Sequence, residues 1–428
     1  MQALVRTEEG GYSNLVLKSQ LACFGGTAQE RAFAAAVFYG TVERKNTLDY
    51  CLGKFLQKPL SRLDAPVRAI LRAGLYQAKY MQSVPVHAAV SESVALCRRM
   101  RKASAAGLVN AVLRRAAAVD VGKETFESET QRLCVQYSVS QPVAELLQRQ
   151  LPAYAERLLA ASFEKPALAV RVNTLRTTPQ ALSAQLAAHG VKARPGRVAN
   201  SLVLEGAGDV AALPEFCSGL FHVQGEASQA ACAALAPRPG EKVLDMCAAP
   251  GGKSATLAQY MENKGALFSR DAVQSRVPLI EETLARLGVS CANICCADAR
   301  IYDAVLDGAD AVLCDVPCTG LGVLAKKPDI RYKSLEGLEE LYTVQRAILH
   351  TSARYVRPGG RLVYSTCTVN PQENEAAVQA FLAGHPGFCL RRAGCAVPGA
   401  LEADGMAVLL PFFTQTDGFF IASLERLW

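Results

Sequence analysis

The stretch DMCAAPGGKS, residues 245–254, decides the fold of the carboxyl-terminal half of the chain. It follows the apolar run at 242–246 and precedes a helical pattern, so it is a turn of small residues between a strand and a helix. Small residues let backbone N–H groups approach a ligand closely. The GxGxxG fingerprint of nicotinamide-binding folds is absent, which argues against a nicotinamide enzyme.

Outward from this turn, short apolar strands alternate with helical segments from Pro237 onward. The alternation predicts a doubly wound parallel sheet, which binds ligands beyond the carboxyl ends of its strands. Asp271 ends the second strand, where a carboxylate can hold both hydroxyls of a ribose, so we expect a nucleoside-like cofactor. The predicted strands are residues 242–246, 266–271, 293–298, 311–315 and 361–364.

Asp271, Asp298 and Asp315 each stand at the end of a predicted strand. Any one of them could instead cap the following helix. Three in succession favour a common edge that binds a ligand.

Two cysteines follow strands on the same expected edge, Cys318 in DVPC (315–318) and Cys367 in STCT (365–368). Two thiols there can meet over one substrate atom, and a thiolate can add to an electron-poor ring carbon. The alternative is a pair of buried cysteines that end strands. Fifteen cysteines in a chain without an export signal are expected to be reduced, mostly buried, and without a metal site.

The first third of the chain is helical and basic. Apolar residues recur at three- and four-residue spacing from Ala28 to about Ala118, which predicts a helical bundle. Residues 1–123 hold 18 Lys and Arg against 8 Asp and Glu, although the net charge of the whole chain is only +7. This excess favours an anionic partner, with a solvated face as the alternative. The clusters are Arg98, Arg99, Arg101 and Lys102, then Arg114 and Arg115, with Arg68, Arg72 and Lys79 along a third helix.

Between the two ends we expect helical connecting material and then a small α/β module, with strands at 167–173 and 202–204 around a helix at 178–189. Near the carboxyl terminus, Asp417-Gly418 between the runs 408–413 and 419–424 predicts a hairpin that closes the sheet. The loop 326–331, KKPDIR, is expected either to guide RNA, with Lys327 as a contact, or to be solvated.

Together, DMCAAPGGK (245–253), DVPC (315–318), STCT (365–368) and NPQENE (370–375) resemble the Sun/Fmu group of RNA 5-methylcytosine methyltransferases. RAFAAAVFYGTVER (31–44) and GLVNAVLR (107–114) resemble the NusB-type RNA-binding domain of the RsmB branch. The resemblance covers nearly the whole chain. Val316 stands where the family usually has alanine, and Ser269-Arg270 stand where apolar residues are commoner. Neither departure touches a proposed catalytic atom, and they bear only on the assignment of the ribose contact.

The resemblance implies S-adenosyl-L-methionine as cofactor and a covalent intermediate between Cys367 and C6 of cytosine. It implies that Cys318 takes part in the release step and that Asp315 lies between cofactor and base. Asp271 would hold the ribose and Asp298 would lie by the adenine. The full expected cofactor set is Cys247, Ala248, Ala249, Pro250, Gly251, Gly252, Lys253, Asp271, Arg276, Asp298 and Asp315.

The sequence thus predicts an all-α NusB-like domain (1–125), a helical linker (126–165), a small α/β module (166–236) and a Rossmann-like class I methyltransferase domain (237–428) with a mostly parallel, seven-stranded sheet. The expected activity is methylation of cytosine C5 in 16S ribosomal RNA by a cytoplasmic monomer without a membrane segment. The alternatives are a transfer-RNA or other RNA cytosine, or a non-catalytic RNA-binding assembly factor.

Overall fold

The computed structural model describes residues 1–11, 13–395 and 397–428. The chain forms two compact units: Met1–Ala160 with Lys326–Leu335, and Ala161–Ala325 with Glu336–Trp428. We call them the helical unit and the catalytic unit. The four-part division expected from the sequence remains a prediction. Within the described residues, no helix is long and apolar enough to cross a membrane.

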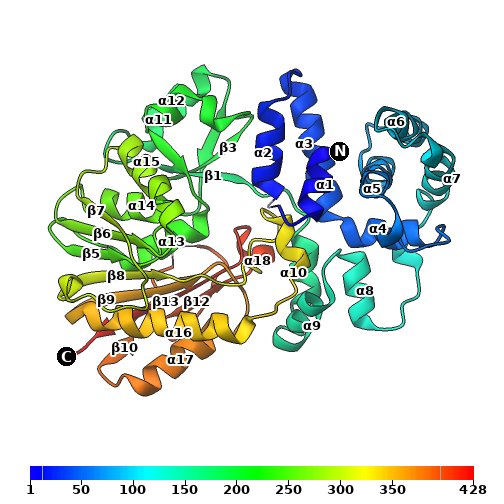
Figure 1. Ribbon diagram of the computed structural model, residues 1–428. Coiled ribbons are helices and arrows are strands. Elements are labelled where there is room, and N and C mark those ends of the chain that lie inside the picture. Colours follow the sequence, from blue (N-terminus) through cyan, green and yellow to red (C-terminus); the bar gives the residue numbers. More distant parts are fainter. Residues whose placement is uncertain (12, 396) are drawn as a thin grey trace. The chain divides into compact units, whose positions relative to one another are not determined.

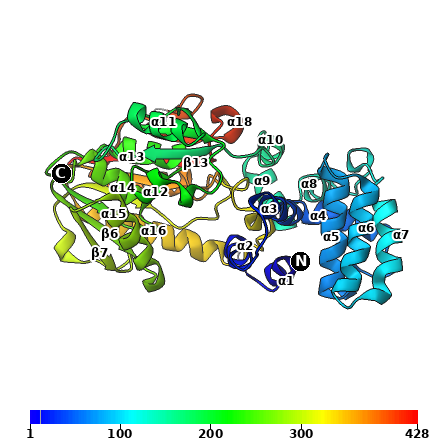
Figure 2. The same ribbon diagram turned by 90° about the horizontal axis from the view of Figure 1, so that it is seen from above.

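The helical unit is built on the apolar spacing seen in the sequence, because the side chains at those positions form its core. Leu48, Ile70, Leu71 and Leu75 are fully buried, and Figure 2 shows α5, α6 and α7 lying side by side. The helices are α1 (Gln2–Glu8), α2 (Ser13–Ala22), α3 (Ala28–Glu43), α4 (Lys45–Gly53), α5 (Ala65–Tyr80), α6 (Val86–Arg99), α7 (Ala106–Ala116), α8 (Glu129–Gln136), α9 (Gln141–Gln150) and α10 (Ala155–Ala161).

The segment Lys326–Leu335 comes from far along the chain but folds as part of the helical unit. It contains the short 3-10 helix η7 (Pro328–Tyr332), in which Arg331 is fully buried. The Arg331 guanidinium donates to the carbonyl of Tyr137 at 3.0 Å, and the Ser140 N–H donates to the carbonyl of Arg331 at 2.7 Å. The expectation of a solvated or RNA-guiding loop is therefore wrong for Arg331, because long-range packing buries it.

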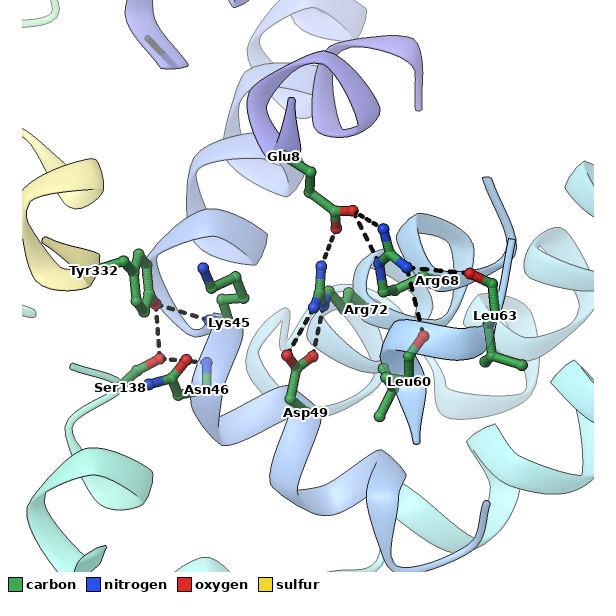
Figure 3. A network of polar contacts seen from close by, with 10 residues as sticks. All are labelled: Glu8, Lys45, Asn46, Asp49, Leu60, Leu63, Arg68, Arg72, Ser138 and Tyr332. Carbon is green, nitrogen blue, oxygen red and sulfur yellow. Dashed lines mark hydrogen bonds and ion pairs between the residues drawn. The ribbon is translucent and has the colours of Figure 1, made fainter. Parts of the chain in front are cut away.

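Tyr332 joins this segment to two parts of the helical unit (Figure 3). Its hydroxyl lies 2.8 Å from the Ser138 hydroxyl, accepts from the Lys45 N–H at 3.0 Å and donates to the Glu43 carbonyl at 2.9 Å. The Lys45 ammonium lies 3.9 Å from the centre of the Tyr332 ring. Asp329 accepts a hydrogen bond from the Ser13 hydroxyl at 2.6 Å. The segment is thus fixed to both α2 and the turn before α9.

The catalytic unit begins with a small antiparallel sheet in the strand order β2-β3-β1-β4. Leu182 and Leu186 of α11 (Pro179–Ala188) pack on its apolar face with Val170 and Val172. The predicted α/β module is confirmed. Its strands are β1 (Leu168–Val172), β2 (Lys192–Pro195), β3 (Ser201–Glu205) and β4 (Phe221–Val223), with the short α12 (Pro214–Cys217) before β4.

The large sheet has the order β11-β12-β13-β9-β8-β5-β6-β7, and β10 pairs with β13. Strands β5 to β9 are parallel to one another, whereas β10 to β13 pair antiparallel. The doubly wound fold is confirmed. The strands are β5 (Lys242–Asp245), β6 (Ala266–Asp271), β7 (Ala292–Cys296), β8 (Ala309–Asp315), β9 (Val356–Thr366), β10 (Phe388–Leu390), β11 (Leu401–Ala403), β12 (Met406–Leu409) and β13 (Phe419–Arg426).

Two details of this sheet differ from the prediction. It has nine strands in the described residues rather than seven, because β10 and β11 are three-residue strands that leave no periodic pattern. The closing pair β12–β13 is antiparallel as expected, but its first strand ends at Leu409 rather than Phe413. Pro411 begins the short helix α18 (Pro411–Thr414), since proline cannot donate to a strand ladder.

Helices cover both faces of the large sheet. Figure 1 shows α14 (Gly252–Tyr260) and α15 (Val277–Leu287) on one face, with α16 (Leu338–Tyr355) and α17 (Glu375–Gly384) on the other. The first face buries α13 (Glu226–Leu235) and α14 against Val243 and Leu313. The second buries α16 and α17 against Leu244 and Val312. This layering leaves the carboxyl ends of the parallel strands as an edge where loops can gather polar groups.

Candidate active site

The edge beyond the parallel strands gathers the residues that the sequence singled out. Asp245 ends β5, Asp271 ends β6 and Asp315 ends β8, and the loops after β8 and β9 carry Cys318 and Cys367. β8 pairs with both β5 and β9, so these three carboxyl ends are neighbours. The predicted common edge is formed.

The two cysteines meet at this edge. The Cys318 and Cys367 sulfur atoms lie 3.3 Å apart, within hydrogen-bond distance, and both side chains are partly buried. The hydrogen bond to Cys367, together with burial, raises the pKa of Cys318 well above its ordinary value. A thiol that keeps its proton beside a second sulfur can donate a hydrogen bond to it. Either sulfur can be the donor of this contact, and the raised pKa of Cys318 agrees with Cys318 as that donor.

An ion pair lies on the same edge. The Lys253 ammonium is 2.7 Å from Asp315 Oδ2, and the Ser365 hydroxyl donates to Asp315 Oδ1 at 2.7 Å. Burial acts to lower the pKa of Lys253, but the charge and hydrogen bond of Asp315 outweigh it and raise that pKa above its ordinary value. Each Asp315 oxygen therefore has one donor already and keeps capacity for another.

The turn after β5 fits the implied cofactor, S-adenosylmethionine. Gly251 has φ +102°, and a Cβ there would lie 3.2 Å from the Ile280 Cα, so the close approach to α15 requires glycine. Asp271 is buried and accepts from the backbone N–H groups of Ala249 and Val273 at 3.2 and 3.0 Å, which fixes its orientation.

The charge of this edge also fits S-adenosylmethionine, which carries a sulfonium, an ammonium and ribose hydroxyls. Asp245 is fully buried, burial raises its pKa to about 6, and its Oδ1 has no hydrogen-bond partner within the described residues. A carboxylate oxygen left without a donor suits a cationic or hydroxyl-bearing ligand and opposes a phosphate.

Two residues of the expected cofactor set lie apart from this arrangement. Asp298 follows β7, but both of its oxygens are held by the guanidinium of Arg300 at 2.5–3.0 Å. Arg276 lies in the exposed 3-10 turn Gln274–Arg276. Their roles toward a cofactor remain proposals. Cys247 lies within the turn, and burial raises its pKa well above the ordinary value, which favours its protonated form.

The basic residues singled out in the sequence fall into two groups. One group is exposed: Arg98 and Arg99 end α6, Arg101 follows them, Arg114 and Arg115 end α7, and Lys327 precedes η7. Lys102 is half-buried and pairs with Asp64 at 2.6 Å. Since α6 and α7 follow one another as a helical hairpin, the two arginine clusters lie at opposite ends of it.

The other group is used inside the helical unit (Figure 3). Arg72 is buried between Glu8 and Asp49, pairing with Asp49 at 2.5 Å, and Arg68 also pairs with Glu8 at 2.5 Å. The Lys79 ammonium donates to the carbonyl of Val119. These three charges hold helices together, so they lie outside the RNA-binding surface that we consider below.

Sequence reasoning missed the partner of Lys253 and the role of Glu373. Lys253 was assigned only to the cofactor turn, and Glu373 only to a family motif. Glu373 is fully buried beneath the two cysteine loops. The available signal was a glutamate within a run of polar residues directly after a strand, which periodicity alone does not distinguish from a loop.

Three family models match the chain. They are described as 16S rRNA methyltransferase RsmB/F (residues 232–425), NusB family (1–118) and Methyltr_RsmF/B-like, ferredoxin-like domain (143–211). The probable ribosomal RNA small subunit methyltransferase B of Bacillus subtilis strain 168 is 34% identical over 439 residues, which cover 100% of this chain and 97% of the relative.

Solved structures agree with this match. The crystal structure of PH0851 has 27% sequence identity and a TM-score of 0.82, covering 99% of this chain and 97% of its own. A methyltransferase homolog protein from Pyrococcus horikoshii has 28% identity and a TM-score of 0.61, covering 71% of this chain and 100% of its own.

Fold and site together define a methyltransferase that uses S-adenosylmethionine, which supplies an electrophilic methyl group when bound. Within that class, the chain belongs to the RsmB/F family of 16S rRNA methyltransferases, with the NusB-like and ferredoxin-like domains that its family models describe.

Proposed function

We propose that the protein methylates carbon 5 of a cytosine in 16S, small-subunit ribosomal RNA, with Cys367 as nucleophile and Cys318 as its partner. The observation that carries this proposal is the 3.3 Å contact between the two sulfur atoms at the cofactor edge. The names of the family model and of the Bacillus subtilis relative support the ribosomal substrate.

The chemistry needs a thiolate because C5 of cytosine is a poor nucleophile. The Cys367 thiolate adds to C6, and the electron pair of the C5–C6 bond then makes C5 nucleophilic toward an electrophilic methyl group. In this scheme Cys318 keeps its proton and donates toward Cys367, which fits its raised pKa. The pair thus divides into an attacking sulfur and a protonated one.

Addition to C6 makes the cytosine ring basic at N3, so a proton must be available at that edge of the base. Asp315, ion-paired with Lys253, is the residue that we assign to this edge. In this scheme an ammonium proton of Lys253 passes through Asp315 to N3 as N3 becomes basic, which leaves Lys253 neutral until the base is released, and the Ser365 hydrogen bond orients the carboxylate.

Release reverses the addition. The Cys318 thiol gives its proton to the departing sulfur of Cys367 and takes the C5 proton in its place, while the electrons of the C5–H bond re-form the C5–C6 double bond and the C6–sulfur bond breaks. Cys318 lies beside that sulfur and assists this step. Without Cys318, the adduct is expected to form and persist.

The exposed basic residues of the helical unit are proposed to bind RNA phosphates. Arg98, Arg99, Arg101, Arg114 and Arg115 are at the surface, where Lys and Arg contacts to phosphate carry salt-dependent affinity. Lys102 and Lys327 belong to the same proposed set.

Transfer of labelled methyl from S-adenosylmethionine to 16S ribosomal RNA, followed by bisulfite mapping with and without the gene, tests the proposal. We expect one protected cytosine that disappears without the gene. Labelling of transfer RNA instead would move the substrate to that alternative. A protein that binds RNA but transfers no methyl group would be an assembly factor.

A further inference from the structure

Glu373 is the most completely held carboxylate near the two cysteines. It is fully buried in the segment between β9 and α17. Its Oε2 accepts from the Thr319 N–H at 2.8 Å and the Gln345 amide at 2.9 Å. Its Oε1 accepts from the Thr319 hydroxyl at 2.6 Å and the Asn370 amide at 3.1 Å. All four donors are neutral, and within the described residues no lysine or arginine pairs with Glu373.

These contacts hold Cys318 from both sides. Thr319, directly after Cys318, donates to Glu373 through both its backbone and its hydroxyl. Before Cys318, the carbonyl of Pro317 accepts from the Gln345 amide at 2.9 Å, and the same amide nitrogen also donates to Glu373. Gln345, from α16, is itself buried. Glu373 therefore anchors the backbone that flanks Cys318.

The two cysteine loops are also matched residue by residue. The sulfurs of Cys318 and Cys367 are 3.3 Å apart, and the next residues, Thr319 and Thr368, have hydroxyl oxygens 2.8 Å apart. An ionised carboxylate can only accept, so Thr319 gives its hydroxyl proton to Glu373 and accepts from Thr368. The direction of this chain of hydrogen bonds is thus set by the charge on Glu373.

We propose that Glu373 is a positioning residue that acts through Thr319 and Gln345 to hold Cys318 against Cys367, so that the methylated base can be released. The inference rests on the proposed covalent mechanism. Glu373 also adds to the raised pKa of Cys318, after the larger effects of Cys367 and burial, which helps to keep that thiol protonated.

The variant Glu373→Gln keeps the shape of the side chain but replaces one acceptor oxygen with a donor amide. Each oxygen of Glu373 accepts two hydrogen bonds, so the amide nitrogen faces two donors whichever oxygen it replaces, and both of those contacts are lost or must reverse. The Cys367 loop keeps its strand β9, so attack and methyl transfer are expected to survive. Displacement of Cys318 then slows release alone.

The experiment uses the full chain with 16S RNA in single-turnover reactions. It measures methyl transfer by labelled cofactor and release by the decay of the denaturant-resistant protein–RNA adduct. For Glu373→Gln we expect transfer within about threefold of the parent and release slower by about ten- to a hundredfold, below the 10²–10⁴ typical of a lost acid or base. Glu373→Asp, which keeps the charge, should recover part of the release rate.

Glu375→Gln is the matched control. Glu375 lies two residues on, is half-buried, and makes no side-chain hydrogen bond to the Cys318 loop within the described residues. It should leave both rates unchanged. If Glu373→Gln fails to fold, judged by its unfolding midpoint and cofactor binding, Gln345→Met removes the bridge between Glu373 and Pro317, leaves the Thr319 contacts of Glu373 in place, and should slow release in the same direction.

Equal slowing of transfer and release in the soluble variants, or no adduct with Glu373→Gln when Cys318→Ala traps one, would overturn the positioning role and leave the proposed function standing. Absence of an adduct even with Cys318→Ala would instead remove the covalent mechanism itself. The two failures are therefore distinguishable.

Discussion

Charged groups are used differently in the helical unit and at the edge of the large sheet. In the helical unit, Arg72 is enclosed by Glu8 and Asp49, so each buried charge meets an opposite one (Figure 3). At the sheet edge, Asp245 keeps an oxygen without a donor, and Cys318 keeps a proton beside a second sulfur. Fully paired charges stabilise a fold, whereas incompletely paired ones remain able to bind and react.

The largest effect is expected at the reactive edge. Cys367→Ala should lower methyl transfer by about ten thousandfold or more, because no other group on the edge can replace the thiolate. Methyl incorporation and adduct trapping measure this. Cys217→Ala is the control, since Cys217 is an exposed cysteine of α12 that lies outside the proposed site. An adduct formed through Cys318 in the absence of Cys367 would reverse the two roles.

In the helical unit the corresponding test affects stability. Arg72→Met leaves Asp49 without its partner and leaves Glu8 with Arg68 alone, so it should lower the free energy of unfolding by about 3 kcal/mol. Urea denaturation measures the change, and the exposed Arg98→Met should change it by less than about 0.5 kcal/mol. Equal effects of the two variants would mean that the Arg72 ion pairs are not structural.

A pH series tests whether burial of Asp245 destabilises its ionised carboxylate. Its folded pKa of about 6 lies above the ordinary value of 3.8, so the folded protein binds this proton more tightly than the unfolded chain. That stabilisation is complete below pH 3.8 and is lost as the pH rises through about 6, by ~3 kcal/mol in all. Asp245→Asn should remove this decline. If unfolding midpoints of parent and variant keep a constant difference from pH 4 to pH 7, the carboxylate is not destabilised.

The smallest effect concerns the exposed arginines. Replacing Arg98, Arg99 and Arg101 together with glutamine should weaken RNA binding roughly tenfold and reduce the salt slope of log K by up to about 3. Lys102→Gln, whose ammonium already pairs with Asp64, should change the slope less. RNA affinity measured from 50 to 200 mM salt for the parent protein and both variants tests this prediction. An unchanged slope in the triple variant would remove these residues from the RNA-binding surface.

The helices and strands that the sequence predicted are those whose apolar residues recur with a local helical or strand periodicity. The strand ending at Asp271 lies where the pattern indicated, and α5 begins at Ala65 within the helical periodicity that runs from Ala28 to about Ala118. Even so, Asp64 does not cap that helix with its side chain, because it pairs with Lys102. The helices α1 and α2, which precede Ala28, were not among the predicted elements.

Only those site residues that belong to a recognisable motif could be predicted from the sequence. The residues that meet at the edge, Cys318, Cys367 and Asp315, were found from strand ends and family resemblance. Glu373 was assigned no role and Arg331 was wrongly expected in a surface loop, because their partners lie far away in the sequence, at Thr319 and Tyr137. A local sequence pattern does not predict which distant hydrogen-bond donor or carbonyl will bind a buried charged side chain.

The segment Lys326–Leu335 has a consequence for the order in which the protein is made. The helical unit comes first in the chain, yet Arg331 and Tyr332 supply the partners of Tyr137, Ser138 and Ser140. At 5–20 residues per second, the ribosome needs roughly 9 to 35 s to pass from residue 160 to residue 335. During that interval the nascent helical unit lacks one of its parts, so its folding is completed only after much of the catalytic unit has been synthesised.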